Sequence, residues 1–229
     1  SLSLIKIQKK KLIKSKITWI SKIEKLNKIP SIFIANEFFD AIPIKQFRKE
    51  NNQWFEKFVH LKSKNKSFYF DKKTNIDKIE KKIHFRISKN QNFIEYSEIG
   101  LNYLKKISNI IKKNNGGLLL IDYGYSQKKM KNTLQAISNH KFANILSNIG
   151  NVDISHNINF NLFKEFTNRI GGLKNILTTQ KNFLLKMGIK ARAEIISNNH
   201  TFLEKADIYY RLDRLINEKK MGSLFKDML

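Results

Sequence analysis

The order of apolar and polar residues along the chain predicts buried strands that alternate with amphipathic helices. Ser31–Ala35 and Gly117–Asp122 are short runs that are apolar on both faces, as strands of a covered parallel sheet are. Ile99–Ile111 has the spacing of an amphipathic helix, which the residues around Asn114-Asn115 and Gly116-Gly117 end. Further helices are predicted at Leu4–Leu12, Asn161–Ile170, Lys181–Lys186 and Thr201–Asn217. This alternation indicates an open, parallel α/β sheet.

The segment between the two predicted parallel strands has a different period. Gln46–Phe70 alternates between apolar and polar residues, with turn residues at Asn51-Asn52 and Lys64-Asn65, and this pattern predicts an antiparallel meander. The meander belongs to an insert at about residues 46–95 that we expect to pack beside the parallel sheet and not inside it. Ile17–Ile20 and Leu224–Leu229 are predicted as short strands, and Ser21–Leu26 as a helical turn. Because no Gly- or Pro-rich linker divides the chain, residues 1–229 are predicted to form one domain that carries this insert.

The amino-acid composition excludes several classes of site and of protein. A hydrophobic fraction of 41% is enough for a packed core, and the absence of cysteine excludes disulfides, thiolate metal sites and cysteine nucleophiles. No apolar run approaches the roughly 20 residues that span a bilayer. The sequence starts at Ser1 without a signal peptide, so we expect its start to be a cut or processed end.

The formal net charge of +25 is a candidate signal for nucleic acid or an anionic membrane surface. However, most of the cations are lysines scattered along the chain, and asparagine and isoleucine are enriched with them. All three residues have AT-rich codons, so we attribute the charge to compositional bias and keep nucleic-acid binding as the weaker alternative. Aromatic residues of the meander could stack bases, but their alternating spacing is more typical of the buried face of a sheet.

Polar side chains directly follow both predicted parallel strands. Asn36, Glu37 and Asp40 follow the first strand, and Asp122, Tyr123 and Gly124 follow the second. In open α/β sheets ligands bind outside the carboxyl ends of the strands, so these residues form the candidate site. Gly124 would permit a tight turn there. The alternative is an ordinary strand exit with Asp40 as a cap after the first strand, and a simple strand-to-loop corner after the second. The five histidines have no H-x-x-x-H spacing, and no metal site is predicted.

The same two segments resemble a known family. ANEFFDAIPIKQF (Ala35–Phe47) and GGLLLIDYGY (Gly116–Tyr125) are similar to the MidA family of S-adenosyl-L-methionine (SAM)-dependent methyltransferases, which includes the mitochondrial complex I assembly factor with protein-arginine methyltransferase activity. TLQAISNH, DISHNINF, TTQKNFLLKMGI and MGSLFK follow in the family's order. Asn159 stands where the family usually has aspartate, which weakens a functional role for that position.

The resemblance implies a Rossmann-like sheet, SAM as cofactor and a protein substrate, namely an arginine of a respiratory complex I subunit. Members of the family begin with a glycine-rich loop and a strand that ends in an acid, but the nine glycines here contain no G-x-G-x-G. We therefore expect a partial sheet that lacks its first strands and keeps the acceptor side. The compartment is either a bacterial cytoplasm or a mitochondrial matrix, and a homodimer stays open.

The resemblance also suggests roles for the candidate residues. A guanidinium arrives protonated, because its pKa lies above 12, so a carboxylate must orient it for attack on the methyl group. Glu37 and Asp40 are the expected catalytic residues, and Asn36 with Glu37 is expected to contact the cofactor. Asp122, Tyr123 and Gly124 are expected to line the substrate side. The alternative within the family is an assembly factor that keeps the fold but has lost methyl transfer.

Overall fold

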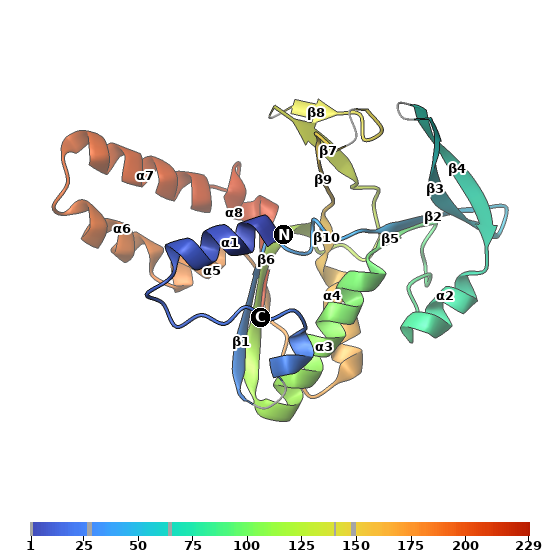
Figure 1. The fold of residues 1–229 in the computed structure, drawn as a ribbon, viewed down its shortest axis with the longest axis horizontal. Coiled ribbons are helices and arrows are strands. Elements are labelled where there is room, and N and C mark those ends of the chain that lie inside the picture. Colours follow the sequence, from blue (N-terminus) through green and yellow to red (C-terminus); the bar gives the residue numbers. More distant parts are fainter. Residues whose placement is uncertain (1, 27–28, 64–65, 140, 148–149) are drawn as a thin grey trace.

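The computed structural model describes residues 2–26, 29–63, 66–139, 141–147 and 150–229. Its central sheet has the order β1-β6-β12-β11, and a short fifth strand, β10, pairs with the end of β6 (Figure 1). These strands are β1 (Ser31–Asn36), β6 (Gly116–Tyr125), β10 (Ile158–Asn159), β11 (Leu177–Thr179) and β12 (Phe225–Met228). The predicted parallel pairing of β1 with β6 is confirmed. The predicted strand at the C-terminal end is also present, but it runs antiparallel to β6.

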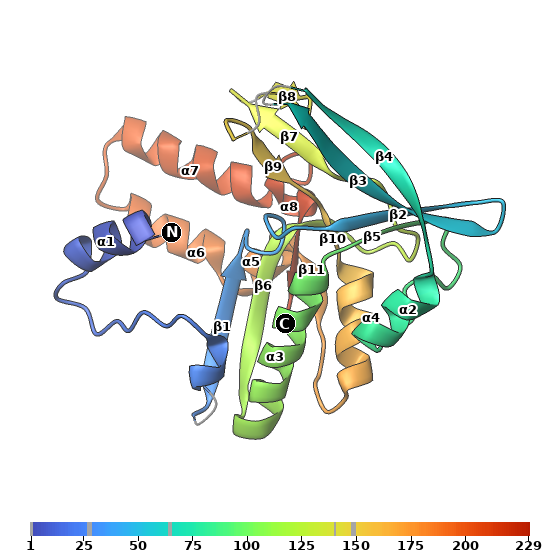
Figure 2. The same ribbon diagram turned by 45° about the vertical axis from the view of Figure 1, so that its right-hand side comes forward.

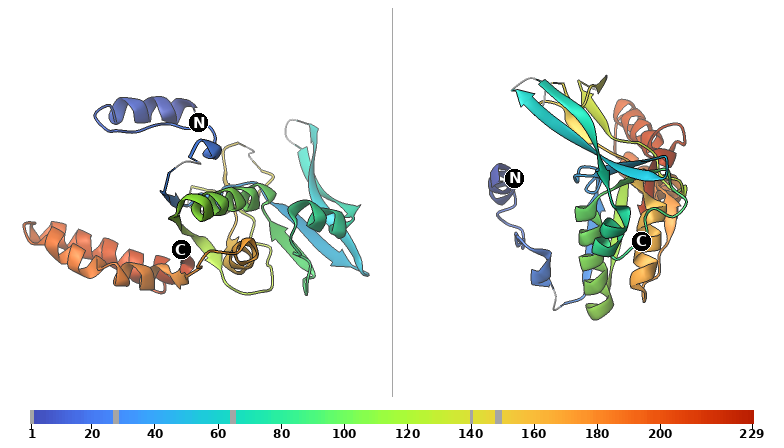
Figure 3. Two further views of the ribbon diagram at one scale, coloured as in Figure 1. Left: turned by 90° about the horizontal axis from the view of Figure 1, so that it is seen from below. Right: turned by 90° about the vertical axis from the view of Figure 1, so that its right-hand side faces the viewer.

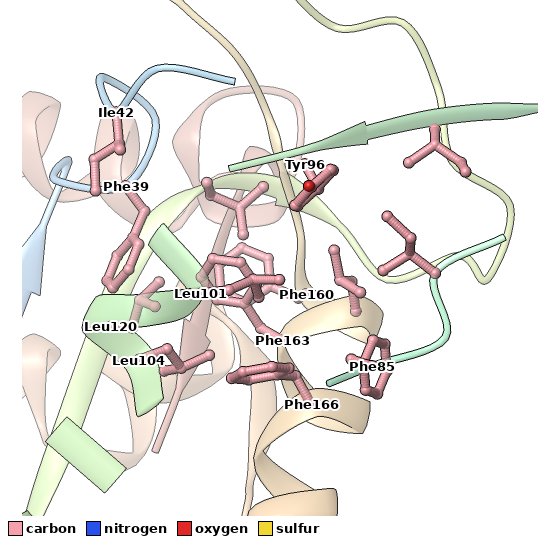
Figure 4. Close-up of a cluster of buried hydrophobic side chains, with 14 of the residues drawn as sticks. Phe39, Ile42, Phe85, Tyr96, Leu101, Leu104, Leu120, Phe160, Phe163 and Phe166 are labelled. Carbon is pink, nitrogen blue, oxygen red and sulfur yellow. The ribbon is translucent and has the colours of Figure 1, made fainter. Parts of the chain in front are cut away.

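Two helices cover one face of this sheet (Figure 2). They are α3 (Glu98–Asn114) and α4 (Phe160–Ile170), which begin at the predicted places because Ser97 and Asn159 accept backbone N–H bonds as N-caps. Leu104 and Phe163 on these helices pack with Leu120 of β6 in the buried cluster that Figure 4 shows. This core packs against the face of β1 and β6 that the two helices cover.

The opposite face of β1 is open. Ile32 and Ile34 point away from the helices and are 81% and 70% exposed, so the expected burial of this strand on both faces is wrong here. Only one edge of β1 is paired within the described part of the chain. Further along the sheet, four helices gather beside β11 and β12. They are α5 (Gln180–Lys186), α6 (Ile189–Ser197), α7 (Phe202–Ile216) and α8 (Met221–Leu224).

The segment between β1 and β6 forms a second, antiparallel sheet of order β4-β3-β2-β5, as the alternation predicts. Its elements are β2 (Lys45–Glu50), β3 (Gln53–Ser63), β4 (Lys66–Thr74), α2 (Ile76–Ile83) and β5 (Phe93–Tyr96). The turn at Asn51-Asn52 is confirmed, with φ values of 47° and 59° at the two residues, whereas the expected turn at Lys64-Asn65 lies outside the described residues. A third sheet, which the pattern does not predict, has the order β8-β7-β9 and consists of Lys141–Ala143, Gln135–Ser138 and Asp153–Ser155.

The described residues before β1 contain one helix and one short 3-10 helix, joined by an irregular segment. The predicted helix is present as α1 (Leu2–Lys11), and the predicted turn is the 3-10 helix Ile23–Leu26. The expected strand at Ile17–Ile20 is wrong, because this segment pairs with no strand in the described part of the chain. Figure 3 shows α1 standing apart from the central sheet. Among the described residues, no helix is long and apolar enough to cross a bilayer.

Candidate functional site

The carboxyl end of β1 lies beside Ile121 of β6, and β6 continues to Tyr125. Asn36 is in register with Ile121, and the backbone N–H of Glu37 donates to the carbonyl of Ile121 over 3.0 Å. Glu37, which follows β1, and Asp122, which lies within β6, are therefore neighbours in space, although about 85 positions separate them in the sequence. This is the arrangement that the sequence predicts for the candidate site.

Glu37 occupies an unusual backbone conformation. Its φ is 46°, in the left-handed region that residues other than glycine rarely adopt and that carries a free-energy cost. Its side chain is exposed, and so is that of Asn36 directly before it. Both polar side chains therefore face solvent at the carboxyl end of β1, where a ligand can reach them.

Asp122 has the opposite environment, because its side chain is fully buried. One carboxylate oxygen accepts backbone N–H groups from Phe39 and Asp40 over 3.0 and 3.3 Å, and the other accepts the N–H of Tyr123 over 2.9 Å. Burial raises the pKa of Asp122 to about 7; the charge of Asp40 adds to this increase and the three backbone donors oppose it. Asp122 thus fixes the loop that carries Glu37 and Asp40.

Asp40 is half-buried on this loop. Burial raises its pKa above the ordinary value, and the negative charge of Glu37 raises it further, while His156 lowers it. The backbone N–H of His156 donates to the carbonyl of Asp40 over 3.1 Å. The structure therefore brings a histidine from a distant segment to the candidate carboxylates.

Tyr123 and Gly124 complete the end of β6. The Tyr123 ring packs on Phe225 with 4.0 Å between ring centroids, and burial, Glu37 and Asp40 raise its pKa. Asp122, Tyr123 and Gly124 all lie within β6, so the expected strand end at Asp122 and the tight turn that Gly124 would permit are wrong. A Cβ atom at this position would lie 2.4 Å from the carbonyl oxygen of Ile158 and 2.6 Å from the Phe160 ring, so glycine allows β10 to approach β6.

Sequence reasoning missed one residue of this site and undervalued another. His156 lies 116 positions after Asp40, and no local spacing links the two residues. The side chain of Asn159, which stands where the family resemblance expects aspartate, accepts the N–H of Leu162 over 3.0 Å and caps α4. Aspartate and asparagine are comparable N-caps, so this substitution keeps the structural role.

The residues present fit one part of the expected methyl donor. Asn36 and Glu37 are polar, exposed and placed at the carboxyl end of β1, where open α/β sheets bind their ligands, and they are the residues that could hold the amino-acid end of SAM. A glycine-rich cradle for the nucleoside has no counterpart in these 229 residues. No group of three or more His, Asp or Glu side chains that could hold a metal ion occurs in the described parts of the chain.

Residues 1–178 match Methyltransf_28, a family of S-adenosyl-L-methionine-dependent methyltransferases. The chain belongs to this methyltransferase family. Curated relatives include the mitochondrial protein arginine methyltransferase NDUFAF7 of Danio rerio, 28% identical over 220 residues, and that of Homo sapiens, 25% identical over 226 residues. The matches cover 92% and 91% of this chain but 49% and 47% of those proteins, so the chain spans about half the length of these relatives.

Two solved structures from Burkholderia thailandensis share the fold of this family member. One is an uncharacterised protein with a TM-score of 0.72, and the other, bound to S-adenosyl-homocysteine, has a TM-score of 0.71. Each is 19% identical to this chain, and each match covers 93% of it but only 58% and 56% of the solved chains. The expected Rossmann-like methyltransferase fold, with an antiparallel β insert, is confirmed.

Proposed function

We propose that this chain supplies the acceptor side of a SAM-dependent methyltransferase that methylates arginine side chains of proteins. The observation that carries the proposal is the loop after β1, which presents Glu37 and Asp40 and is held by the buried carboxylate of Asp122. Membership of the methyltransferase family and the names of the curated relatives support the same function.

The chemistry requires a negative group at this place. The guanidinium enters protonated, and a carboxylate that binds it can direct one nitrogen to the methyl group of SAM. The N–C bond forms as the C–S bond breaks, the sulfonium becomes a neutral thioether, and the nitrogen then gives up a proton. Glu37 is the proposed orienting carboxylate, with Asp40 as its partner and Asn36 toward the methyl donor.

The candidate site is acidic, whereas the net charge of the chain is strongly positive. A net charge of +25 repels basic peptides at long range, so attraction has to come from Glu37, Asp40 and the neighbouring Asp153. At physiological ionic strength this attraction acts within a Debye length of about 8 Å. The proposal therefore favours recognition of a single arginine at short range over recognition of an extended basic segment.

The finer proposal is that the acceptor is a subunit of respiratory complex I, as the resemblance to the MidA family implies. Relatives named as mitochondrial enzymes support the mitochondrial matrix as the compartment in a eukaryotic host, and the cytoplasm is the counterpart in a bacterium. In this proposal the segment Asp122–Gly124 forms part of the acceptor side. Asp122 holds the loop that carries Glu37 and Asp40, and Gly124 leaves room for β10 to pair with β6.

The experiment is transfer of a radiolabelled methyl group from SAM. The protein, expressed from its complete reading frame, is incubated with host extract, and labelled bands are analysed for methylarginine. We expect label on arginine that Glu37→Gln abolishes and that Glu194→Gln, an exposed acid on α6, retains. Label on another residue type would overturn the arginine assignment, and absence of any transfer would favour the non-catalytic assembly factor.

A further inference from the structure

Two buried polar atoms beside the candidate site have no hydrogen-bond partner among the described residues. They are Oδ1 of Asp40 and Nε2 of His156, and His156 is only 6% exposed. Leaving such an atom unpaired costs about 1–3 kcal/mol, so it calls for a specific explanation such as a proton, a ligand or a catalytic role. Neither atom takes part in holding the loop after β1, which Asp122 already fixes.

The backbone keeps His156 next to Asp40. Its N–H donates to the Asp40 carbonyl, and the following N–H, of Asn157, donates to Oγ1 of Thr133 over 2.8 Å. The N–H of Thr133 in turn donates to the buried carboxylate of Glu95 on β5 over 3.2 Å. A chain of hydrogen bonds thus runs from the antiparallel sheet to the histidine and fixes its position relative to Asp40.

We propose that Asp40 and His156 act as a proton-accepting pair for methyl transfer. This proposal rests on the proposed function. The nitrogen electron pair forms the new N–C bond, the electrons of the C–S bond stay on sulfur, and the methylated nitrogen releases a proton. Asp40, which is half-buried at the strand end, takes that proton, and the neighbouring His156 stabilises the ionised Asp40 carboxylate that accepts it. Asp40 is then a catalytic residue, and His156 is a positioning residue that acts through it.

The charges around Asp40 agree with this pairing. Glu37 and Asp153 strengthen proton binding by Asp40 and His156 weakens it, and Asp122, whose own pKa is raised by burial and by Asp40, lies beside them. Burial is the largest cause of the raised Asp40 pKa. Removing the imidazole therefore raises the Asp40 pKa further, and Asp40 ionises only at higher pH.

The pair is tested first without any reaction. Carboxyl groups of the 229-residue chain are followed by 13C NMR from pH 3 to 8, with Asp40 assigned from Asp40→Asn. We expect His156→Gln to raise the titration midpoint of Asp40 and His200→Gln, in an exposed turn, to leave it unchanged. An unchanged midpoint in His156→Gln would overturn the pairing. If His156→Gln does not fold, the ring signal of His156 in the unsubstituted chain decides, because it must show a step at the Asp40 midpoint.

The second test uses methyl transfer by the protein expressed from its complete reading frame. We expect His156→Gln to lower kcat at least tenfold with little change in the KM of the acceptor, and to move the acid limb of the pH–rate profile. An equal loss at every pH, together with a lower melting temperature, would overturn the catalytic role of the pair and leave a structural one. If the unsubstituted protein transfers no methyl group, the proposed function fails and with it the catalytic role of the pair, while the NMR titration still decides whether Asp40 and His156 are coupled.

Discussion

Asp227 offers a quantitative test of the electrostatics inside the central sheet. The side chain lies on β12, is fully buried, and neither of its carboxylate oxygens has a hydrogen-bond partner within the described residues. Burial raises its pKa from 3.8 to about 6, although the positive charge of Lys226 opposes the increase. We predict that Asp227→Asn, which removes the charge and nearly keeps the shape, stabilises the protein at neutral pH.

The magnitude and its pH dependence follow from linkage. A pKa difference of about 2 units corresponds to roughly 3 kcal/mol, at about 1.36 kcal/mol per unit. Because the folded state binds the proton more tightly, wild-type stability is highest below about pH 4 and falls as the pH rises to about 6. The variant should therefore match the wild type at pH 4 and exceed its free energy of unfolding by up to about 3 kcal/mol at pH 8.

Urea unfolding followed by circular dichroism at pH 4 and pH 8 measures this difference. Asp207→Asn is the matched control, because Asp207 is an exposed aspartate that pairs with Arg211 on the surface of α7, and its loss should change little at either pH. If Asp227→Asn changes stability equally at both pH values, or destabilises the protein at pH 8, then the carboxylate is stabilised in its charged form and the reasoning is wrong.

Three further predictions concern the site and its surroundings. Glu37→Gln should lower single-turnover methyl transfer by roughly 10²–10³, the usual effect of losing one preorganised electrostatic contact, and Asp40→Asn should lower it less. Gly124→Ala should reduce the free energy of unfolding by about 1–3 kcal/mol, because the new Cβ meets the Ile158 carbonyl. The 229-residue chain alone should bind SAM more weakly than micromolar in calorimetry, because the glycine-rich loop is absent from its sequence.

Each of these has its own control. Glu37→Gln must keep the SAM affinity and melting temperature of the unsubstituted protein, and a loss of activity that only follows unfolding would make Glu37 structural. Gly117→Ala on the same strand is the comparison for Gly124→Ala, since a Cβ there meets nothing within 4 Å, and equal losses would reject the steric explanation. Micromolar binding of SAM would show that the nucleoside needs no glycine-rich loop.

Local sequence patterns predicted the positions of strands and helices better than they predicted how the strands pair. The strands β1 and β6 and the helices α3, α4 and α7 were predictable because apolar spacing, caps and glycines are local signals. The antiparallel direction of β12 was not, because strand direction depends on where the preceding helices return the chain. Ile17–Ile20 has the propensity of a strand, but β-branched residues form one only where another strand offers an edge.

The sequence predicted where the candidate site lies, but not which of its acids are exposed and which are buried. Both acids, Glu37 and Asp122, follow a run of apolar residues in the sequence, and this context does not show that one is exposed and the other fully buried. Burial of Asp122 comes from packing against the loop whose N–H groups it accepts. The contact of His156 with Asp40 likewise depends on the path of the chain through the third sheet, which the residue pattern did not predict.

The position of the antiparallel sheet within the chain has a consequence for the order of folding. The β1–β6 pairing joins Ser31 to Gly116, 85 positions apart, and the strands β2 to β5 all lie inside this loop. Contacts within the β3–β4 hairpin are local and form on a microsecond timescale, whereas closing the long loop is entropically costly and slow. We therefore expect the hairpin to form first and to shorten the loop that the central pair must close. Glu37 and Asp122 then meet only in the last, slowest stage. In a newly synthesised chain the antiparallel insert therefore folds before the candidate site is formed.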